Sequence, residues 1–266
     1  MVAGAFMKEL LMHDTANEWA APRDSLSTES RLQEIDPAMP QNHLIEKLTR
    51  QDRARLLGLC RPVELVLTEV LCRPGEKLRH VYFPVDSFIS LVTNADHRSA
   101  LEVGMIGSEG MLGAHVALEV AEAPLQALVQ GGGSAWRVEV VAFRRLLQES
   151  ASLRRVMNRY VYVLMSQFAT SAACLRYHRI ELRLARWLLM SQDRAHADDF
   201  RVTQEFLAYM LGVRRVGVTV AASALQARGL IRYARGHMHV LDRGGLEMAA
   251  CSCYATDVAM YAHQLE

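Results

Sequence analysis

The chain has 266 residues, of which 51% are hydrophobic, and its formal net charge at pH 7 is +1. This length and composition indicate a globular protein with room for two domains, each with its own core. No run of about 18 apolar residues predicts a membrane span. The five scattered cysteines favour free thiols in a reducing compartment over a disulfide framework. We therefore expect a cytoplasmic protein without a membrane partner.

Residues 1–41 are expected to form a flexible N-terminal tail outside the folded domains. This stretch contains three prolines and, from Asp24 to Glu34, a segment rich in serine, threonine and acidic residues. Neither pattern favours a packed core. Residues 1–12 are partly apolar, but they lack the basic segment and the cleavage site of a signal peptide.

Residues 42–150 are predicted to form a small antiparallel β-barrel or jelly roll, preceded by a short helix from Asn42 to Leu56. Short runs of β-forming residues follow one another at intervals of roughly ten residues, and most of them end at proline, asparagine or glycine. Such a barrel serves as a sensor or binding domain as often as a catalytic one. The expected strands are residues 63–71, 81–83, 88–93, 101–105, 125–130 and 135–141.

Residues 151–178 are predicted to form one long helix. Two neighbouring stripes of positions recur at heptad spacing, one beginning at Leu153 and the other at Val161. We expect one stripe to pack on the barrel and the other on a partner helix, and the pattern leaves open which is which. A helix buried in one large monomeric core is the alternative. The positions assigned to the dimer helix are Leu153, Met157, Tyr160, Leu164, Phe168 and Leu175.

Residues 179–266 contain a pattern typical of a winged helix-turn-helix. Ala208 is a small contact residue in the first helix, and Gly212 is placed where the turn needs a positive φ. Gly229 ends the second helix, and two short β-forming runs on either side of Arg235-Gly236 predict a hairpin, the wing. The apolar residues spaced to close the helix pair are Leu207, Leu211, Val218 and Ala221.

Positive charge is concentrated in this C-terminal module. Residues 201–245 contain seven arginines and two acidic residues, whereas residues 1–178 contain 19 basic and 20 acidic residues. A concentration of positive charge around a single motif is typical of a surface that binds nucleic acid. We therefore predict double-stranded DNA as the partner.

The second helix of the motif is the predicted recognition helix. Its first turns carry Arg214, Arg215, Val216 and Thr219, which are assigned to base reading. The last three share a face at i, i+1, i+4 spacing. Arginine recognises guanine edges, and the methyl surface of Val216 suits a thymine methyl group.

A second set of residues is assigned to the DNA backbone. Thr203 is expected to cap the first helix and to donate to a phosphate. Gly217 is expected to let the backbone approach the phosphates. The alternative is that glycine, a weak helix former, is simply tolerated at this position. Arg232 and Arg235 on the wing are expected to contact phosphates.

The succession of barrel, long helix and winged helix-turn-helix resembles the Crp/Fnr superfamily of bacterial transcription regulators, over about residues 42–254. The resemblance implies an α+β fold with a cyclic-nucleotide-binding-like jelly roll and a homodimer on a near-palindromic operator. It further implies that Arg215, Val216 and Thr219 face base edges and that RNA polymerase is a partner. The residues that carry it are Arg73-Pro74-Gly75-Glu76, Tyr82-Phe83-Pro84, Gly110-Met111-Leu112-Gly113 and Thr203 to Tyr233.

The sequence departs from the cyclic-nucleotide-binding members at the effector pocket. Those members place a glutamate after the first glycine of the loop, where Met111 stands here. They carry an Arg-Ser or Arg-Thr pair about ten residues later, near Pro124-Leu125, and no arginine lies between Gly113 and Arg137. A buried cyclic phosphate without a cation would be poorly compensated. We expect no tight binding of cyclic AMP and a vestigial pocket formed by Glu109, Gly110, Met111, Gly113, Pro124 and Leu125.

No cofactor is predicted, and the effector is unknown. Residues 1–59 contain no cysteine, so the N-terminal cluster of the iron–sulfur members is missing. The paired histidines His237 and His239 and the paired cysteines Cys251 and Cys253 are metal-capable types. They are expected on a wing strand and on a terminal helix respectively, so no metal site is predicted.

Two other functions remain open beside a DNA-binding regulator with an atypical sensor barrel. The first is a cyclic-nucleotide-responsive regulator that uses unfamiliar contacts. The second is a cupin-like barrel enzyme whose C-terminal helices serve only assembly. Because the closely spaced histidine pair of a cupin metal site is missing, we favour a regulator that is not an enzyme.

Overall fold

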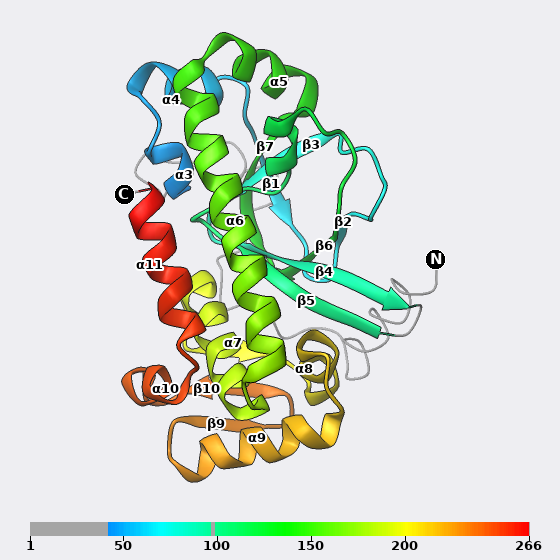
Figure 1. Cartoon of the computed structure of the whole chain (residues 1–266), viewed down its shortest axis with the longest axis vertical. Coiled ribbons are helices and arrows are strands. Elements are labelled where there is room, and N and C mark those ends of the chain that lie inside the picture. Colours follow the sequence, from blue (N-terminus) through cyan, green and yellow to red (C-terminus); the bar gives the residue numbers. More distant parts are fainter. Residues whose placement is uncertain (1–41, 97–98, 266) are drawn as a thin grey trace, which may run out of the picture.

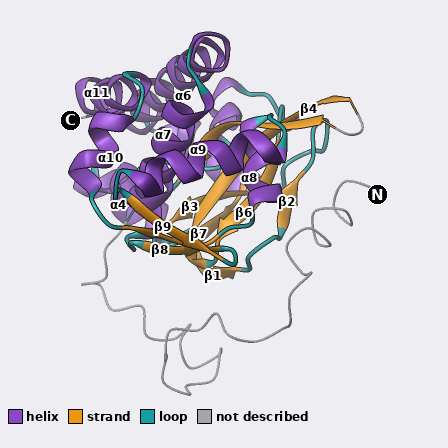
Figure 2. Ribbon diagram, turned by 90° about the horizontal axis from the view of Figure 1, so that it is seen from below, coloured by secondary structure: helices purple, strands orange, loops and turns teal. Residues whose placement is uncertain are grey.

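The computed structural model describes residues 42–96 and 99–265 (Figure 1). The predicted tail, residues 1–41, lies outside the described residues. Two antiparallel sheets occupy one half of the molecule, and the long helix α6 connects them to a mainly helical C-terminal module. Figure 2 shows the helices gathered on one side of the sheets.

Two short helices, α3 (His43–Glu46) and α4 (Arg50–Leu57), stand where a single helix was expected. Asn42 and Thr49 cap them, because each side chain accepts a hydrogen bond from the first turn of the helix that follows it. Asn42 also donates to the carbonyl oxygen of Gly110 at 2.7 Å. The first described residue is thereby tied to the β domain.

The β domain consists of two sheets with strand orders β1-β7-β3 and β2-β6-β4-β5. All pairings are antiparallel, as predicted for a jelly-roll type of fold. The 3₁₀ helix η1 (Ala114–Leu118) follows the glycine loop. The strands are β1 (Arg61–Leu65), β2 (Val70–Cys72), β3 (His80–Pro84), β4 (Phe88–Asp96), β5 (Ser99–Ile106), β6 (Gln126–Gly131) and β7 (Gly133–Glu139).

The strand predicted over residues 63–71 is wrong, because the chain turns between β1 and β2. Thr68 has a φ of 73°, and the side chain of Glu69 accepts a hydrogen bond from the amide of Val66 at 3.3 Å. The turn contains neither glycine nor proline, so the composition gave no signal for it.

The last predicted strand, residues 135–141, is also too long. Val140 and Val141 begin helix α5 (Val140–Glu149), which the sequence analysis missed. The β-branched residues at its start favour a strand, but Val140, Phe143, Leu146 and Leu147 are buried at helical spacing. Packing of that apolar face overrides the local preference.

The sheet β2-β6-β4-β5 is covered on both faces. Ala127 and Val129 of β6 point into the core of the β domain, whereas Leu128 between them belongs to the core of the C-terminal module. The same alternation separates Met105 from Ile106 on β5. This sheet is therefore the packing surface between the two halves of the molecule.

The predicted long helix is confirmed as α6 (Ala151–Tyr177). The stripe that begins at Leu153 faces the core of the β domain in its first half. Leu153, Met157 and Tyr160 are almost completely buried in the core of the β domain, so their side chains cannot face a partner. Phe168 and Leu175 of the neighbouring stripe are half-buried, as is Leu164. The assignment of the first three to a dimer contact is corrected.

The C-terminal module is built on helix α7 (Ile180–Ala195), which precedes the helix-turn-helix. Helices α8 (Gln204–Leu211) and α9 (Arg215–Ala227) make an angle of 107°, within the usual range for this motif. The wing is a sheet of order β8-β10-β9, and α10 closes the module. The bounds of these last elements are β8 (Asp199–Arg201), β9 (Ile231–Ala234), β10 (His237–Val240) and α10 (Arg243–Ala249).

Helix α11 (Cys253–Leu265) turns back and packs along α6 (Figure 1). Its Leu265 belongs to the core of the β domain, and Tyr261 donates to the carbonyl oxygen of Glu109 at 2.7 Å. The last helix thus packs with the β domain and α6, although the sequence analysis grouped it with the DNA-binding domain.

No single helix in the described ranges is long and apolar enough to cross a membrane. The bent pair α8 and α9 reaches that length and apolarity only when the two helices are taken together.

Candidate DNA interface and effector loop

The recognition helix α9 has a buried face and an open face. Val218 and Ala221 pack into the module, as the apolar spacing predicted, and Leu225 is buried beside them. Arg215, Val216 and Thr219 lie on the exposed side, and 66% of Val216 is accessible. The predicted base-reading residues therefore share a solvent-exposed surface.

Gly212 sets the angle between the two helices of the motif. Its φ is 61°, a left-handed conformation that favours glycine. A Cβ at this position would lie 2.9 Å from Leu101 Cδ1 on β5, so the turn also rests directly against the β domain. The predicted role of Gly212 in the turn is confirmed.

Thr203 caps α8, because its hydroxyl oxygen accepts a hydrogen bond from the amide of Phe206 at 3.1 Å. The hydroxyl of Thr219 donates to Gln204 Oε1 at 2.8 Å and links the first residue of α8 to the second turn of α9. Gln204 and the exposed Val220 extend the open face, and the sequence analysis missed both. The i, i+4 spacing of Val216 and Val220 could have indicated the latter.

Gly217 faces the inside of the module. A Cβ there would lie 2.8 Å from Ile180 Cδ1 at the start of α7. Close packing of two helices thus explains the absence of a side chain, without any need for DNA. The predicted approach of Gly217 to a phosphate stays a prediction.

Neighbouring carboxylates divide the arginines of the module into two groups. Arg228 donates to Glu181 at 3.2 Å, and Arg243 pairs with Asp193 at 2.8 Å. These two guanidinium groups are used within the fold. Among the residues that the structure describes, no carboxylate pairs with the exposed Arg214, Arg215, Arg232 or Arg235.

The glycine loop of the β domain meets the C-terminal module through an ion pair. Arg194 of α7 donates to Glu109 Oε1 from Nη2 at 2.6 Å and from Nε at 3.0 Å. Both side chains are largely buried. Desolvation alone would lower the pKa of Arg194, but the Glu109 carboxylate outweighs it and raises this pKa. Glu109 is thereby committed to Arg194 and not available to a ribose.

Side chains of the same chain fill the space around the glycine loop. Met111 is fully buried, and a Cβ on Gly110 would collide with the hydroxyl of Tyr160 from α6. Gly113, with a φ of 96°, packs against Val81. Pro124 is exposed and Leu125 half-buried at the domain edge. The loop is a packed part of the core, and the vestigial effector pocket stays a prediction.

Comparison with known proteins agrees with this architecture. Residues 182–249 match the model of the Crp-like helix-turn-helix domain. No curated protein sequence matches the chain. A protein from Eubacterium rectale assigned to the Crp/Fnr family of transcriptional regulators has a TM-score of 0.62 at 14% identity, covering 79% of this chain and 99% of its own.

Two further solved structures share the fold. The c-di-GMP-responsive regulator CLP of Xanthomonas campestris has a TM-score of 0.59 at 17% identity, covering 72% of this chain and 99% of its own. FixK2 of Bradyrhizobium japonicum has a TM-score of 0.60 at 14% identity, with coverages of 72% and 98%. The chain has the Crp/Fnr fold and a Crp-like helix-turn-helix domain. The predicted resemblance and fold class are confirmed.

The Crp/Fnr fold separates the two residue pairs that the sequence analysis considered for a metal. His239 lies on β10, and its Nδ1 is 2.6 Å from Asp199 Oδ1. Cys251 and Cys253 lie instead beside the end of α6, next to Cys174 and His178. No pattern of nearby sequence could have indicated this grouping.

The two other thiols, Cys60 and Cys72, lie in the β domain. Burial raises the pKa of the Cys60 thiol to about 12 and that of the Cys72 thiol to about 11. Both groups therefore stay protonated at neutral pH, where a thiol is a weak nucleophile.

Proposed function

We propose that the protein is a sequence-specific DNA-binding transcription regulator of the Crp/Fnr type. The observation that carries the proposal is the exposed face of α9 on a Crp-like helix-turn-helix, with four nearby arginines that pair with no carboxylate of residues 42–96 or 99–265. Unpaired guanidinium groups on a convex helix suit the phosphates and guanine edges of a major groove.

We infer two sets of contacts. Arg215, Val216 and Thr219 on the open face of α9 read base edges, and Arg214 lies at the start of the same helix. Arg232 and Arg235 of the wing, with Thr203 at the start of α8, hold the DNA backbone. Phosphate contacts position the protein, and base contacts give it sequence preference.

The active form is proposed to be a homodimer through α6. The outward face of this helix carries exposed apolar side chains, among them Tyr162 and Met165. A two-fold axis along this face would place two copies of α9 on one side of the assembly. Two recognition helices about 34 Å apart would enter successive major grooves of a near-palindromic operator.

Cyclic AMP is not proposed as the effector. Glu109 is paired with Arg194, Met111 fills the core, and Tyr160 occupies the space beside Gly110. A ligand would have to displace this packing, and the arginine beside the loop, Arg194, is already paired with Glu109. CLP is c-di-GMP-responsive, so that nucleotide is the second one to test. The contact with RNA polymerase stays a prediction from the resemblance.

Selection of bound sites from random duplexes, followed by gel-shift assays, tests the proposal. We expect an enriched, near-palindromic sequence that the double variant Arg214→Ala/Arg215→Ala no longer retards. The matched control is Arg228→Ala, since Arg228 is paired with Glu181 and should be dispensable. Addition of cyclic AMP should leave the affinity unchanged.

A chain that retards no duplex, with or without either nucleotide, would rule out the regulator and favour the barrel enzyme. A large gain in affinity on adding cyclic AMP would show that the packed loop opens. The protein would then be the cyclic-nucleotide-responsive version.

A further inference from the structure

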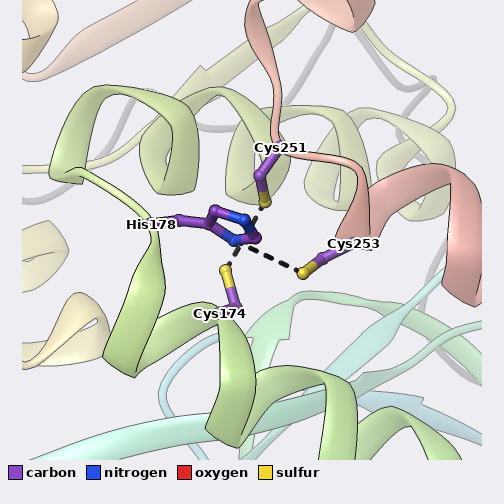
Figure 3. A group of neighbouring side chains, drawn as sticks. All are labelled: Cys174, His178, Cys251 and Cys253. Carbon is purple, nitrogen blue, oxygen red and sulfur yellow. Dashed lines mark hydrogen bonds between the residues drawn. The ribbon is translucent and has the colours of Figure 1, made fainter.

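Four side chains with metal-binding atoms meet where α6 ends and α11 begins (Figure 3). Cys174 lies in the last turn of α6 and His178 caps its C-terminal end, at a spacing that puts both on one helix face. Cys251 lies between α10 and α11, and Cys253 is the first residue of α11. The thiols come from segments more than seventy residues apart and are all buried.

The ligand atoms lie at distances that suit a single ion. All four are within 4.8 Å of one another. Cys174 Sγ is 3.5 Å from Cys251 Sγ, and Cys253 Sγ is 3.5 Å from His178 Nδ1. Tetrahedral zinc, with bonds of about 2.3 Å to sulfur and about 2.0 Å to nitrogen, separates its ligands by about 3.5–3.8 Å.

We propose that Cys174, His178, Cys251 and Cys253 bind one zinc ion. Three thiolates and an imidazole are an established ligand set for structural zinc, and four protein ligands leave no open position for chemistry. Soft sulfur donors in a tetrahedral arrangement select zinc over calcium or magnesium. This inference is independent of DNA binding.

The surroundings of the cluster supply positive charge. Zinc with three thiolates carries a net charge of −1, and the side chains of Arg183 and Arg186 on α7 lie within electrostatic range of Cys174 and Cys251. Arg186 also donates to Asp257 of α11 at 2.6 Å. The ion pair crosses the same junction as the proposed ion, as expected for the outer shell of a metal site.

Two other arrangements of these residues fit less well. An iron–sulfur cluster needs room for an inorganic core of several atoms among its four ligands, and four ligand atoms that all lie within 4.8 Å of one another leave too little space for it. A disulfide between Cys174 and Cys251 requires sulfurs about 2.05 Å apart and would leave Cys253 and His178 without a role. A mononuclear ion uses all four side chains.

The site would fix the relation of three segments. His178 is followed directly by Arg179, the N-cap of α7, so the ion sits at the joint between the long helix and the C-terminal module. It would also hold the start of α11, whose far end packs in the β domain. Metal loss should therefore loosen both the joint and α11.

The test is metal analysis of the purified, reduced full-length chain. We expect one zinc per chain, and cobalt in its place should give thiolate-to-cobalt charge-transfer bands and the intense d–d bands of a tetrahedral site. In Cys251→Ser/Cys253→Ser, zinc content should fall at least about tenfold. The control Cys60→Ser/Cys72→Ser also removes two cysteines and should keep the full zinc content.

The wild-type chain gives a second measurement that does not depend on the folding of variants. A thiol-specific mercurial should release one zinc per chain in step with the modification of three thiols. The proposal is overturned if a chain loaded with zinc holds none after dialysis. It is overturned equally by iron with acid-labile sulfide, by a Cys174–Cys251 disulfide, or by zinc loss in the control alone.

Discussion

At the scale of single residues, the same side-chain type has different roles according to its neighbours. Arg194 is buried against Glu109, and Arg228 is paired with Glu181, so both act within the fold. Arg215 and Arg235 are exposed without a carboxylate partner among the described residues. The count of arginines predicted a basic module, but only the pairing shows which of them remain free for a ligand.

The first residue-scale prediction separates base reading from backbone contact. Arg215→Ala should weaken binding to the selected operator by about 1–3 kcal/mol and relax its sequence preference, because a bidentate contact to guanine is lost. Arg235→Ala should weaken all duplexes alike and reduce the slope of log affinity against log salt by about one. Fluorescence anisotropy on operator and random duplex at several salt concentrations measures both. Identical behaviour of the two variants would refute the division of roles.

The second residue-scale prediction concerns pH. Burial raises the pKa of Glu102 on β5 from 4.5 to about 7, although the Ser90 hydroxyl donates to Glu102 Oε2 at 2.5 Å and favours the charged form. The folded chain therefore holds this proton more tightly than the unfolded chain. Through Glu102, the free energy of unfolding falls as pH rises from about 4.5 to about 7.

Glu102→Gln removes that titration while it keeps the shape of the side chain. The variant should be more stable than the wild type at pH 8 by about 1–2 kcal/mol, and the difference should shrink towards pH 5. Urea unfolding at the two pH values measures it. A difference that is the same at both pH values would mean that Glu102 is already ionised in the folded chain at pH 5.

At the scale of elements, turns and helix ends follow local rules that tertiary contacts then modify. Gly212 and Gly229 both end a helix of the motif and both have a positive φ, 61° and 71°. A Cβ on Gly229 would meet no atom within 4 Å, whereas one on Gly212 would press on Leu101. Comparing alanine substitutions at these two glycines therefore separates the free-energy cost of a left-handed backbone from the cost of a steric clash.

Gly229→Ala should destabilise the protein by about 1 kcal/mol, the cost of a left-handed alanine. Gly212→Ala should cost more, about 2 kcal/mol, because the Leu101 side chain of β5 must also shift. Thermal or urea unfolding of the two variants provides the comparison. Equal losses would indicate that the turn does not rest on the β domain in solution.

At the scale of the whole molecule, one sheet connects the glycine loop, the long helix and the C-terminal module. The outer face of β2-β6-β4-β5 packs on α7 and α8, and the Glu109–Arg194 ion pair crosses the same boundary. Helix α11 packs against both α6 and α7. A change in the β domain therefore has direct contacts through which it can displace α8 and α9.

The whole-molecule prediction concerns the dimer. Met165→Glu places a charge on the outward face of α6, where the side chain is 63% exposed in the protomer. The monomer should stay folded, while the dimer dissociation constant should rise about 100-fold, since two charges would be buried unpaired. Met248→Glu on α10, at an 83% exposed position, is the control. Sedimentation equilibrium measures both, and an unchanged dimer in Met165→Glu would place the interface elsewhere.

The sequence by itself determined the features that depend on near neighbours along the chain. Residue type and spacing predicted the strands from residue 81 to residue 130, the length of α6, the turn at Gly212 and the wing at Arg235-Gly236. These signals suffice because a turn needs a particular φ and an amphipathic helix needs one apolar face. Local preference failed at Thr68, in a turn without glycine or proline, and at Val140, where packing of an apolar helix face outweighed it.

Only the tertiary structure decided the features that join distant segments. It turned Leu153, Met157 and Tyr160 inward, gave Glu109 an arginine partner in α7, and aimed Gly217 at another helix. It also brought Cys174 and His178 to Cys251 and Cys253. Each outcome depends on how α6, α7 and α11 pack against one another. Their packing is set by the burial of apolar area summed over the whole chain, and no short segment of the sequence contains that sum.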